Sequence, residues 1–143
     1  VSSLDPESVR AIFKAYDVRG VYPQEVNEEV VHAIGRAFVS YLSAKRIAVG
    51  RDMRVSSPSM ASAVMEGAAS AGADVLDLGL VGTEMVYFAT FAEEMDGSIM
   101  VTASHNPPDY NGMKFVREKS RPISAPPSKR PWPRRASPAT AKR

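Results

Sequence analysis

The chain has 143 residues, of which 44% are hydrophobic and 24% charged, a composition that suits one soluble domain with a single core rather than a multidomain enzyme. It contains no cysteine, which excludes disulfides, thiolate metal sites and cysteine nucleophiles. No apolar run is long enough to cross a bilayer, and the first residues lack a signal-peptide pattern. We therefore expect a cytoplasmic protein without membrane contact.

The net charge of +2 hides two different segments. Residues 1–116 carry 9 Lys and Arg against 15 Asp and Glu, whereas residues 117–143 carry 9 against 1. From residue 125 the chain is rich in Pro, Arg, Ala and Ser, and Trp132 is its only large apolar side chain. Such a segment has nothing with which to build a core, so we predict a folded domain over 1–124 and a disordered basic tail over 125–143.

The first predicted elements are a short helical turn over 7–15 and a polar loop over 16–20 that ends in glycine. The next helix is well signalled, because Asn27 can cap it and apolar side chains recur on one face as far as about residue 45. A short strand is then expected over 46–51.

Helices and strands continue to alternate along the chain. Ser57 followed by Pro58 indicates a helix start, and the alanine-rich body of that helix runs to about residue 71. A strand over 74–80, a helix capped by Thr83 and a strand over 98–102 follow. We expect the last strand, 113–116, to return along an edge of the sheet after an Asn-Gly turn at 111–112.

This order predicts an α/β fold, a three-layer α/β/α arrangement with a mostly parallel sheet and one antiparallel edge strand. In such sheets ligands bind beyond the carboxyl ends of the strands, where Asp52 and Ser104 fall. Arg51 and Asp52 are expected to pair and hold the strand end. A serine after a strand is, taken alone, more often a cap or turn residue.

Separated motifs change the interpretation of Ser104. The chain contains Ala-Tyr-Asp-Val-Arg-Gly at 15–20, Val-Gly-Arg-Asp at 49–52 followed by Arg54 and Ser-Ser-Pro at 56–58, and Thr-Ala-Ser-His-Asn-Pro-Pro at 102–108 continued by Asp-Tyr-Asn-Gly-Met-Lys. Together with residues 79–84, these motifs resemble the α-D-phosphohexomutases, the phosphomannomutase and phosphoglucomutase group, in order and spacing over about residues 12–124.

The resemblance implies reversible phosphoryl transfer on a hexose phosphate, with hexose 1-phosphate and 6-phosphate as substrates. Ser104 matches the family's serine, which is carried as a phosphoserine. It donates its phosphoryl group to the sugar, gives a bisphosphorylated hexose as intermediate, and takes back the other phosphate. The resemblance also implies Mg²⁺ as cofactor, bound through the phosphate on Ser104.

Further roles follow from the resemblance, each with a structural alternative. Lys114 would stabilise transferring charge or handle a proton, and the alternative is an exposed strand lysine. Tyr16 and Arg19 would bind substrate or phosphate, and a plain loop arginine is the alternative for Arg19. His105 is either catalytic or makes a loop-organising hydrogen bond. Asn106 is assigned to phosphate binding, although it precedes a proline and also suits a turn-shaping role.

The chain departs from the family in length. Family members continue into further domains that supply an aspartate-rich Mg²⁺ loop, a sugar-recognition loop and a C-terminal phosphate-binding loop, and no counterpart of these occurs here. We therefore expect the isolated chain to be inactive and the missing C-terminal domains to be its partners. The resemblance ends near Ser124, and a frameshift in the encoding gene is one hypothesis for the tail.

Other function classes fit less well. A serine hydrolase would show Gly-x-Ser-x-Gly around Ser104, and the adjacent His105 cannot readily act as its base, which leaves only His32. Neither a P-loop nor Gly-x-Gly-x-x-Gly is present. The remaining alternative is a noncatalytic truncated fragment whose basic tail binds anionic partners, with nucleic acid not expected among them.

Overall fold

The computed structural model describes residues 4–123. The tail predicted over 125–143, and with it the hypothesis of an anion-binding tail, lies outside the described residues. Within 4–123 no helix is both long enough and apolar enough to span a membrane. The elements in chain order are α1 (Pro6–Ile12), β1 (Asp17–Val21), α2 (Glu28–Leu42), β2 (Arg46–Arg51), α3 (Ser57–Ser70), β3 (Asp74–Leu80), α4 (Thr83–Ala92), β4 (Gly97–Val101), β5 (Tyr110–Arg117), η1 (Glu118–Ser120) and β6 (Arg121–Pro122).

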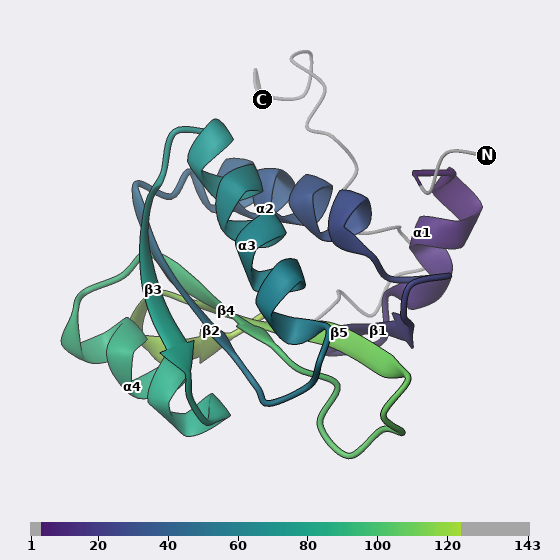
Figure 1. The fold of residues 1–143 in the computed structure, drawn as a ribbon. Helices are drawn as coiled ribbons and strands as arrows, with labels where there is room; N and C mark the ends of the chain where they lie inside the picture. Colours follow the sequence, from purple (N-terminus) through teal and green to yellow (C-terminus); the bar gives the residue numbers. More distant parts are fainter. Residues whose placement is uncertain (1–3, 124–143) are drawn as a thin grey trace, which may run out of the picture.

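The strands form one sheet in the order β1-β5-β4-β2-β3, and β6 pairs with the end of β5. The strand β2 runs parallel to both β3 and β4, whereas β5 runs antiparallel to β4 and β1. Helices α2 and α3 cover one face of the sheet and α4 covers the other (Figure 1). The prediction of a three-layer α/β/α fold with a mostly parallel sheet is confirmed.

The position predicted for the antiparallel strand is wrong. The antiparallel strand β5 lies inside the sheet, because it pairs with β4 on one side and with β1 on the other, and β1 forms the edge. The segment 16–20 had been expected as a loop, yet 17–21 alternates half-buried and buried residues as a strand does. No turn forms at Asn111 and Gly112 either, since both lie within β5, where Gly112 faces Arg19 across the ladder.

Helix starts follow the predicted capping chemistry with small shifts. The Asn27 Oδ1 atom accepts a hydrogen bond from the Val30 N–H at 3.1 Å and caps α2 as expected. The cap of α3 is Ser56 rather than Ser57, and Gly82 rather than Thr83 precedes α4. Neither cap position makes a side-chain hydrogen bond to its helix. Ser57 is instead fully buried in the first turn, where its hydroxyl serves a neighbouring loop.

Glycines bring α2 and α3 into close contact. A Cβ atom at Gly35 would lie 2.4 Å from the Val64 carbonyl oxygen, and one at Gly67 would lie 2.0 Å from the His32 carbonyl oxygen. These helices therefore pack backbone to backbone, and the small residues of α3 serve this contact as well as the sheet. Beneath α2, Phe38 meets Phe115 of β5 with ring centroids 5.5 Å apart.

Helix α4 leaves large apolar side chains in solvent. Phe88 is 64% exposed and Phe91 is 67% exposed, one turn apart on the same helix. Exposed apolar surface of this kind promotes association. We expect the double substitution Phe88→Ser/Phe91→Ser to lower self-association of the chain, measured by light scattering, while the urea midpoint shifts little. Val55→Ser, at a single apolar residue that is 99% exposed, is the control and should leave scattering unchanged. Equal scattering from all three proteins would contradict the expectation.

Candidate active site

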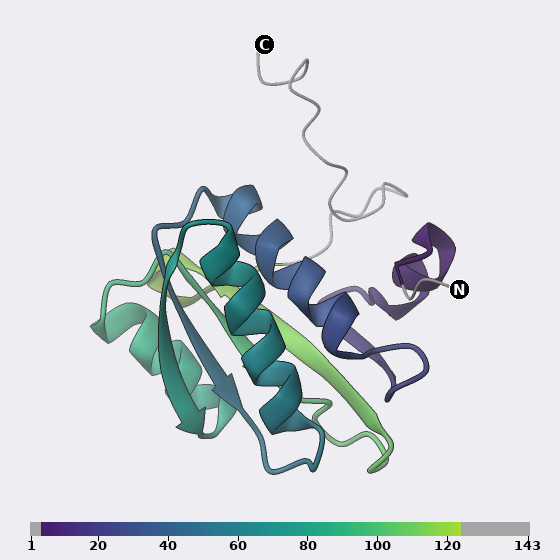
Figure 2. The same cartoon turned by 45° about the horizontal axis from the view of Figure 1, so that its top comes forward.

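The predicted nucleophile lies in the loop between β4 and β5, residues 102–109, called here the serine loop. Thr102 and Ala103 are buried, whereas Ser104 and His105 are exposed. The loop lies beside the segment that joins β2 to α3 (Figure 2), at the carboxyl ends of the parallel strands. Ser104 adopts a left-handed backbone with φ of 54°. The chain thus turns sharply at the residue that carries the hydroxyl.

Arg54 ties the serine loop to the end of β2. Its Nη2 atom donates to the carbonyl oxygens of Ser104 at 3.1 Å and Asn106 at 2.7 Å. Its Nη1 atom donates to the carbonyl oxygens of Pro107 at 2.7 Å and Tyr110 at 3.0 Å. The Arg54 side chain is only 8% exposed, while its acceptors on Ser104 and Pro107 lie at the surface, and its charge strengthens all four hydrogen bonds.

Asp52 orients Arg54 from behind. Its Oδ2 atom lies 3.3 Å from Arg54 Nε as an ion pair, without hydrogen-bond alignment. Its Oδ1 atom accepts from the Ser57 hydroxyl at 2.5 Å and from the Arg54 N–H at 3.1 Å. Buried Asn111 then donates to the Ser57 hydroxyl at 3.0 Å. One polar network therefore joins β5, the start of α3, the end of β2 and the serine loop.

The predicted pair of Arg51 and Asp52 does not form. Arg51 instead lies 3.8 Å from Asp77 of β3, and Asp52 is taken by Arg54. The reason is the bend after β2: Arg51 is the last residue of the strand, whereas Asp52 accepts from the Arg54 N–H across the bend, which leaves the Asp52 carboxylate beside Arg54.

Within the serine loop the structure separates two predicted site residues. The Asn106 amide donates to the Ala103 carbonyl oxygen at 2.7 Å, so this side chain shapes the turn. His105 is exposed and has no hydrogen-bond partner among residues 4–123. The loop is therefore organised by Arg54, Thr102 and Asn106, and the described contacts do not support a loop-organising hydrogen bond from His105.

Lys114 and Arg19 share the face of the sheet that α4 covers. Lys114 faces Met100 of β4 and Asp17 of β1 across the two ladders, and cross-strand partners point to the same face. This is the face of α4, because Ser98, two residues before Met100 in β4, points the same way and its hydroxyl accepts a hydrogen bond from Thr90 of α4. Arg19 pairs with Asp17 at 3.1 Å, whereas the half-buried Lys114 has no ion-pair partner within the described part of the chain.

The structure brings the candidate residues to one region but not into contact. Among the described residues, no hydrogen bond or ion pair joins the side chains of Ser104, His105, Lys114 and Arg19. Tyr16 precedes β1 and is 75% exposed, and no described contact fixes its ring. Arg54 was the residue that sequence reasoning missed, because its four carbonyl partners lie 50 to 56 residues away along the chain.

Comparison with known proteins decides the family. Residues 10–130 match the family described as phosphoglucomutase/phosphomannomutase, alpha/beta/alpha domain I. The chain belongs to this family. A phosphomannomutase of Salmonella montevideo is 55% identical over 112 residues, which cover 78% of this chain and 25% of the relative. A phosphomannomutase of Klebsiella pneumoniae is 54% identical, with 78% of this chain and 71% of the relative covered.

A solved phosphoglucomutase/phosphomannomutase family protein from Burkholderia thailandensis has the same fold. It superposes with a TM-score of 0.75 at 40% identity, over 81% of this chain and 28% of that protein. This phosphohexomutase-family chain thus spans about a quarter of the Salmonella relative and of the solved structure. It carries the alpha/beta/alpha domain that the family description numbers as the first.

The described part of this phosphohexomutase domain does not form a complete Mg²⁺ site. No group of three or more His, Cys, Asp or Glu in residues 4–123 is placed to hold a metal ion. Asp52, the carboxylate at the end of β2, is already engaged by Arg54 and Ser57. Since Mg²⁺ prefers several oxygen ligands in octahedral geometry, any further ligands would come from outside the described residues.

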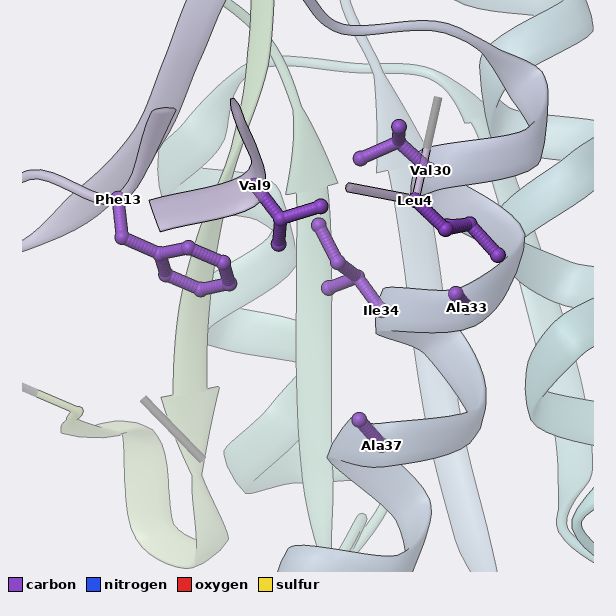
Figure 3. Close-up of a pocket in the computed structure, with 7 residues that line it drawn as sticks. All are labelled: Leu4, Val9, Phe13, Val30, Ala33, Ile34 and Ala37. Carbon is purple, nitrogen blue, oxygen red and sulfur yellow. The ribbon is translucent and has the colours of Figure 1, made fainter. Parts of the chain in front are cut away.

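An apolar pocket of about 190 Å³ lies between α1 and α2, away from the serine loop in sequence (Figure 3). Every residue that lines it is apolar: Leu4, Val9, Phe13, Val30, Ala33, Ile34 and Ala37. A hexose phosphate needs hydrogen-bond donors for its hydroxyl and phosphate groups, so this pocket does not suit the substrate of a phosphohexomutase.

A second polar cluster supports the start of α2. Glu28 Oε1 accepts from the Tyr22 phenol at 2.7 Å and from the Ser59 hydroxyl at 2.6 Å. The hydrogen bond to Glu28 raises the pKa of Tyr22. Burial alone would raise the pKa of Glu28, yet the hydroxyls of Ser59 and Tyr22 hold it below the ordinary value.

This cluster predicts a pH-dependent contribution to stability. Because the pKa of Glu28 is lowered on folding, its contribution is present above the ordinary glutamate pKa and is lost as pH falls through the folded value. We expect Glu28→Gln to lower the free energy of unfolding at pH 7 by less than about 1 kcal/mol, since the carboxylate is partly exposed. The difference should shrink on acidification below about pH 4.

The measurement for Glu28 is the urea midpoint of both proteins at each pH. Glu66→Gln is the matched control, because Glu66 accepts a single hydrogen bond at 3.3 Å from Ser62. A difference between Glu28→Gln and the unsubstituted chain that stays constant with pH would show that the carboxylate charge has no part in it.

Proposed function

We propose that this chain is the serine-bearing domain of a phosphohexomutase that moves phosphate between C1 and C6 of a hexose phosphate. The observation that carries the proposal is the exposed Ser104, held in a left-handed turn at the carboxyl end of β4, in a chain of the phosphoglucomutase/phosphomannomutase family. The names of the relatives support mannose phosphate as substrate, and the family description adds glucose phosphate.

The proposed reaction starts from a phosphate on the Ser104 oxygen. A sugar hydroxyl attacks phosphorus, the bond from phosphorus to the serine oxygen breaks, and a bisphosphorylated hexose results. The intermediate then reorients, and the serine oxygen attacks its other phosphorus. The bond from that phosphorus to the sugar oxygen breaks, the sugar oxygen takes up the serine proton, and the phosphoserine and the product hexose phosphate result. The proton of the attacking hydroxyl needs an acceptor, and the exposed His105 is the candidate in the loop itself.

Phosphoryl transfer depends mainly on position and on stabilisation of charge. Lys114 is the candidate for charge stabilisation, because its ammonium group has no ion-pair partner among the described residues. Arg19 is the candidate for a phosphate contact, since its pairing with Asp17 uses Nε and leaves its terminal nitrogens without a described partner. Tyr16 and the backbone around Asn106 complete the proposed substrate contacts.

We extend the proposal to further domains, because this chain spans about a quarter of the Salmonella relative. The remaining domains of the parent protein would close the site over the substrate, and any further Mg²⁺ ligands would come from outside the described residues. A coupled mutase assay on the isolated chain, with Mg²⁺ and a bisphosphorylated hexose activator, is therefore expected to show no turnover. The proposed site of action is the cytoplasm.

A chimera tests the proposal without requiring activity of the isolated chain. Residues 10–123 replace the matching segment of the Salmonella montevideo phosphomannomutase, and the product is incubated with a bisphosphorylated hexose. Mass spectrometry of its peptides should find one phosphate, on Ser104. A folded chimera that carries phosphate on another residue, or none while the Salmonella enzyme itself is phosphorylated, would overturn the proposal.

A further inference from the structure

Ser104 adopts a backbone conformation that disfavours every residue with a side chain. Its φ of 54° lies in the left-handed region, which costs an L-residue about five- to thirtyfold in equilibrium terms. Ser43 and Glu94 also have positive φ, but they follow the ends of α2 and α4, where such residues commonly close a helix. Ser104 is instead the second residue of a turn after β4, in which the Asn106 N–H donates to the Ala103 carbonyl oxygen at 3.0 Å.

Two further contacts fix the peptide groups on either side of Ser104 within this turn. Its N–H donates to the Thr102 hydroxyl at 3.0 Å, and its carbonyl oxygen accepts from Arg54 Nη2 at 3.1 Å. The peptide groups before and after the Ser104 Cα atom are therefore both fixed. The Thr102 contact is local, whereas the Arg54 contact is one of four to carbonyl oxygens made by a side chain that is only 8% exposed and lies beside Asp52.

The terminal N–H groups of Arg54 are all used by the protein. Its four terminal N–H groups have the carbonyls of the serine loop and of Tyr110, and Nε faces Asp52. Of the five donors of a guanidinium, the four terminal ones are taken by carbonyls, and Nε is buried beside Asp52 without a hydrogen bond, so no donor is exposed to a phosphate. Arg54 therefore does not bind substrate in this arrangement and acts only through the loop.

We propose that Arg54 is a positioning residue that holds Ser104 in its left-handed conformation and so presents the serine hydroxyl outward. The consequence for phosphoryl transfer rests on the proposed function. The conformational role stands on the contacts of Arg54 and Ser104 alone, and it is tested without any substrate.

The test is a cycle of variants of the full chain, each unfolded in urea and followed by circular dichroism. Ser104→Gly and Ser104→Ala are compared with Arg54 present and with Arg54→Lys. Lysine keeps the charge beside Asp52 but cannot span four carbonyls. Glycine is free of the left-handed cost and alanine is not, so the comparison reports the conformation imposed on residue 104.

With Arg54 present, the left-handed turn makes the folding equilibrium constant of Ser104→Gly larger than that of Ser104→Ala. With Arg54→Lys the loop is free to relax, and the ratio of the two folding equilibrium constants is expected to fall by about five- to thirtyfold. If Arg54 were merely a structural contact between loops, Arg54→Lys would destabilise Ser104→Gly and Ser104→Ala equally. An unchanged ratio would overturn the proposal.

A second substitution at Arg54 keeps the test possible if Arg54→Lys prevents folding. If Arg54→Lys does not fold, the ratio is measured in Asp52→Asn/Arg54→Gln, which removes both charges of the pair together. Failure of both backgrounds to fold would show that Arg54 supports the whole domain rather than one residue's conformation, and this also overturns the proposal. The unfolding results do not depend on phosphorylation of the chimera, so failure of the positioning role of Arg54 is distinguishable from failure of the proposed function.

Discussion

Replacing Lys114 with methionine in the Salmonella chimera is expected to lower mutase turnover about a hundredfold or more, as removal of one preorganised charge from a reaction site commonly does. The expectation rests on position. Lys114 is half-buried in a central strand on the same face as Arg19, and its neighbour Asp17 is already paired with Arg19. Methionine keeps the length and apolar stem of the side chain but removes the ammonium group.

The measurement is a coupled assay of turnover and of the KM for the hexose 1-phosphate. Lys45→Met is the matched control, because Lys45 is exposed just before β2, at the opposite end of the strands from the serine loop. The control should leave both values unchanged. Turnover within about threefold of the unsubstituted chimera after Lys114→Met would support the alternative of an exposed strand lysine without a role in phosphoryl transfer.

Replacing Gly112 with alanine is expected to lower the free energy of unfolding by about 3 kcal/mol, the upper range for overpacking a closed interior. A Cβ atom at Gly112 would lie 1.9 Å from the Val18 carbonyl oxygen and 3.1 Å from the Arg19 Cα atom. The atoms that must move belong to the backbone of β1, so the clash cannot be relieved by a change of rotamer. The strand that carries Arg19 would have to separate from β5.

Urea unfolding of Gly112→Ala measures this cost, and Gly82→Ala is the matched control. The atoms nearest to a Cβ atom at Gly82 would belong to the Glu84 carboxylate, the end of a flexible side chain that can turn away. Its effect should stay within about 1 kcal/mol, the usual size for a helix cap position. Equal effects of the two substitutions would show that the approach of β1 to β5 is not as close as the structure has it.

The regular elements were largely predictable because their signals are local. Asn27 caps α2 through a bond three residues away, and β3 spans the predicted residues 74–80. The strand β1 was missed because its polar residues were interpreted as a loop, although Val18 and Gly20 alternate with Asp17 and Arg19. The Asn-Gly pair at 111–112 was misleading, since this glycine serves a close strand contact and not a turn.

The candidate site was predictable only in part. The position of Ser104 after a buried strand follows from local pattern, and its chemistry came from resemblance. What holds the loop depends on partners far apart in sequence: Arg54 bonds to carbonyls between residues 104 and 110, and Asn111 bonds to Ser57. Backbone carbonyl partners leave no mark in the sequence, because every residue type has one.

Mutase turnover of the Salmonella chimera with and without Ser104→Ala decides whether this serine carries the phosphate. Alanine removes the oxygen that would carry the phosphate and changes little else at an exposed position. We predict turnover in the chimera and its loss with Ser104→Ala, while circular dichroism shows both proteins folded. Turnover that persists after Ser104→Ala would contradict the account, because another group would then carry the phosphate.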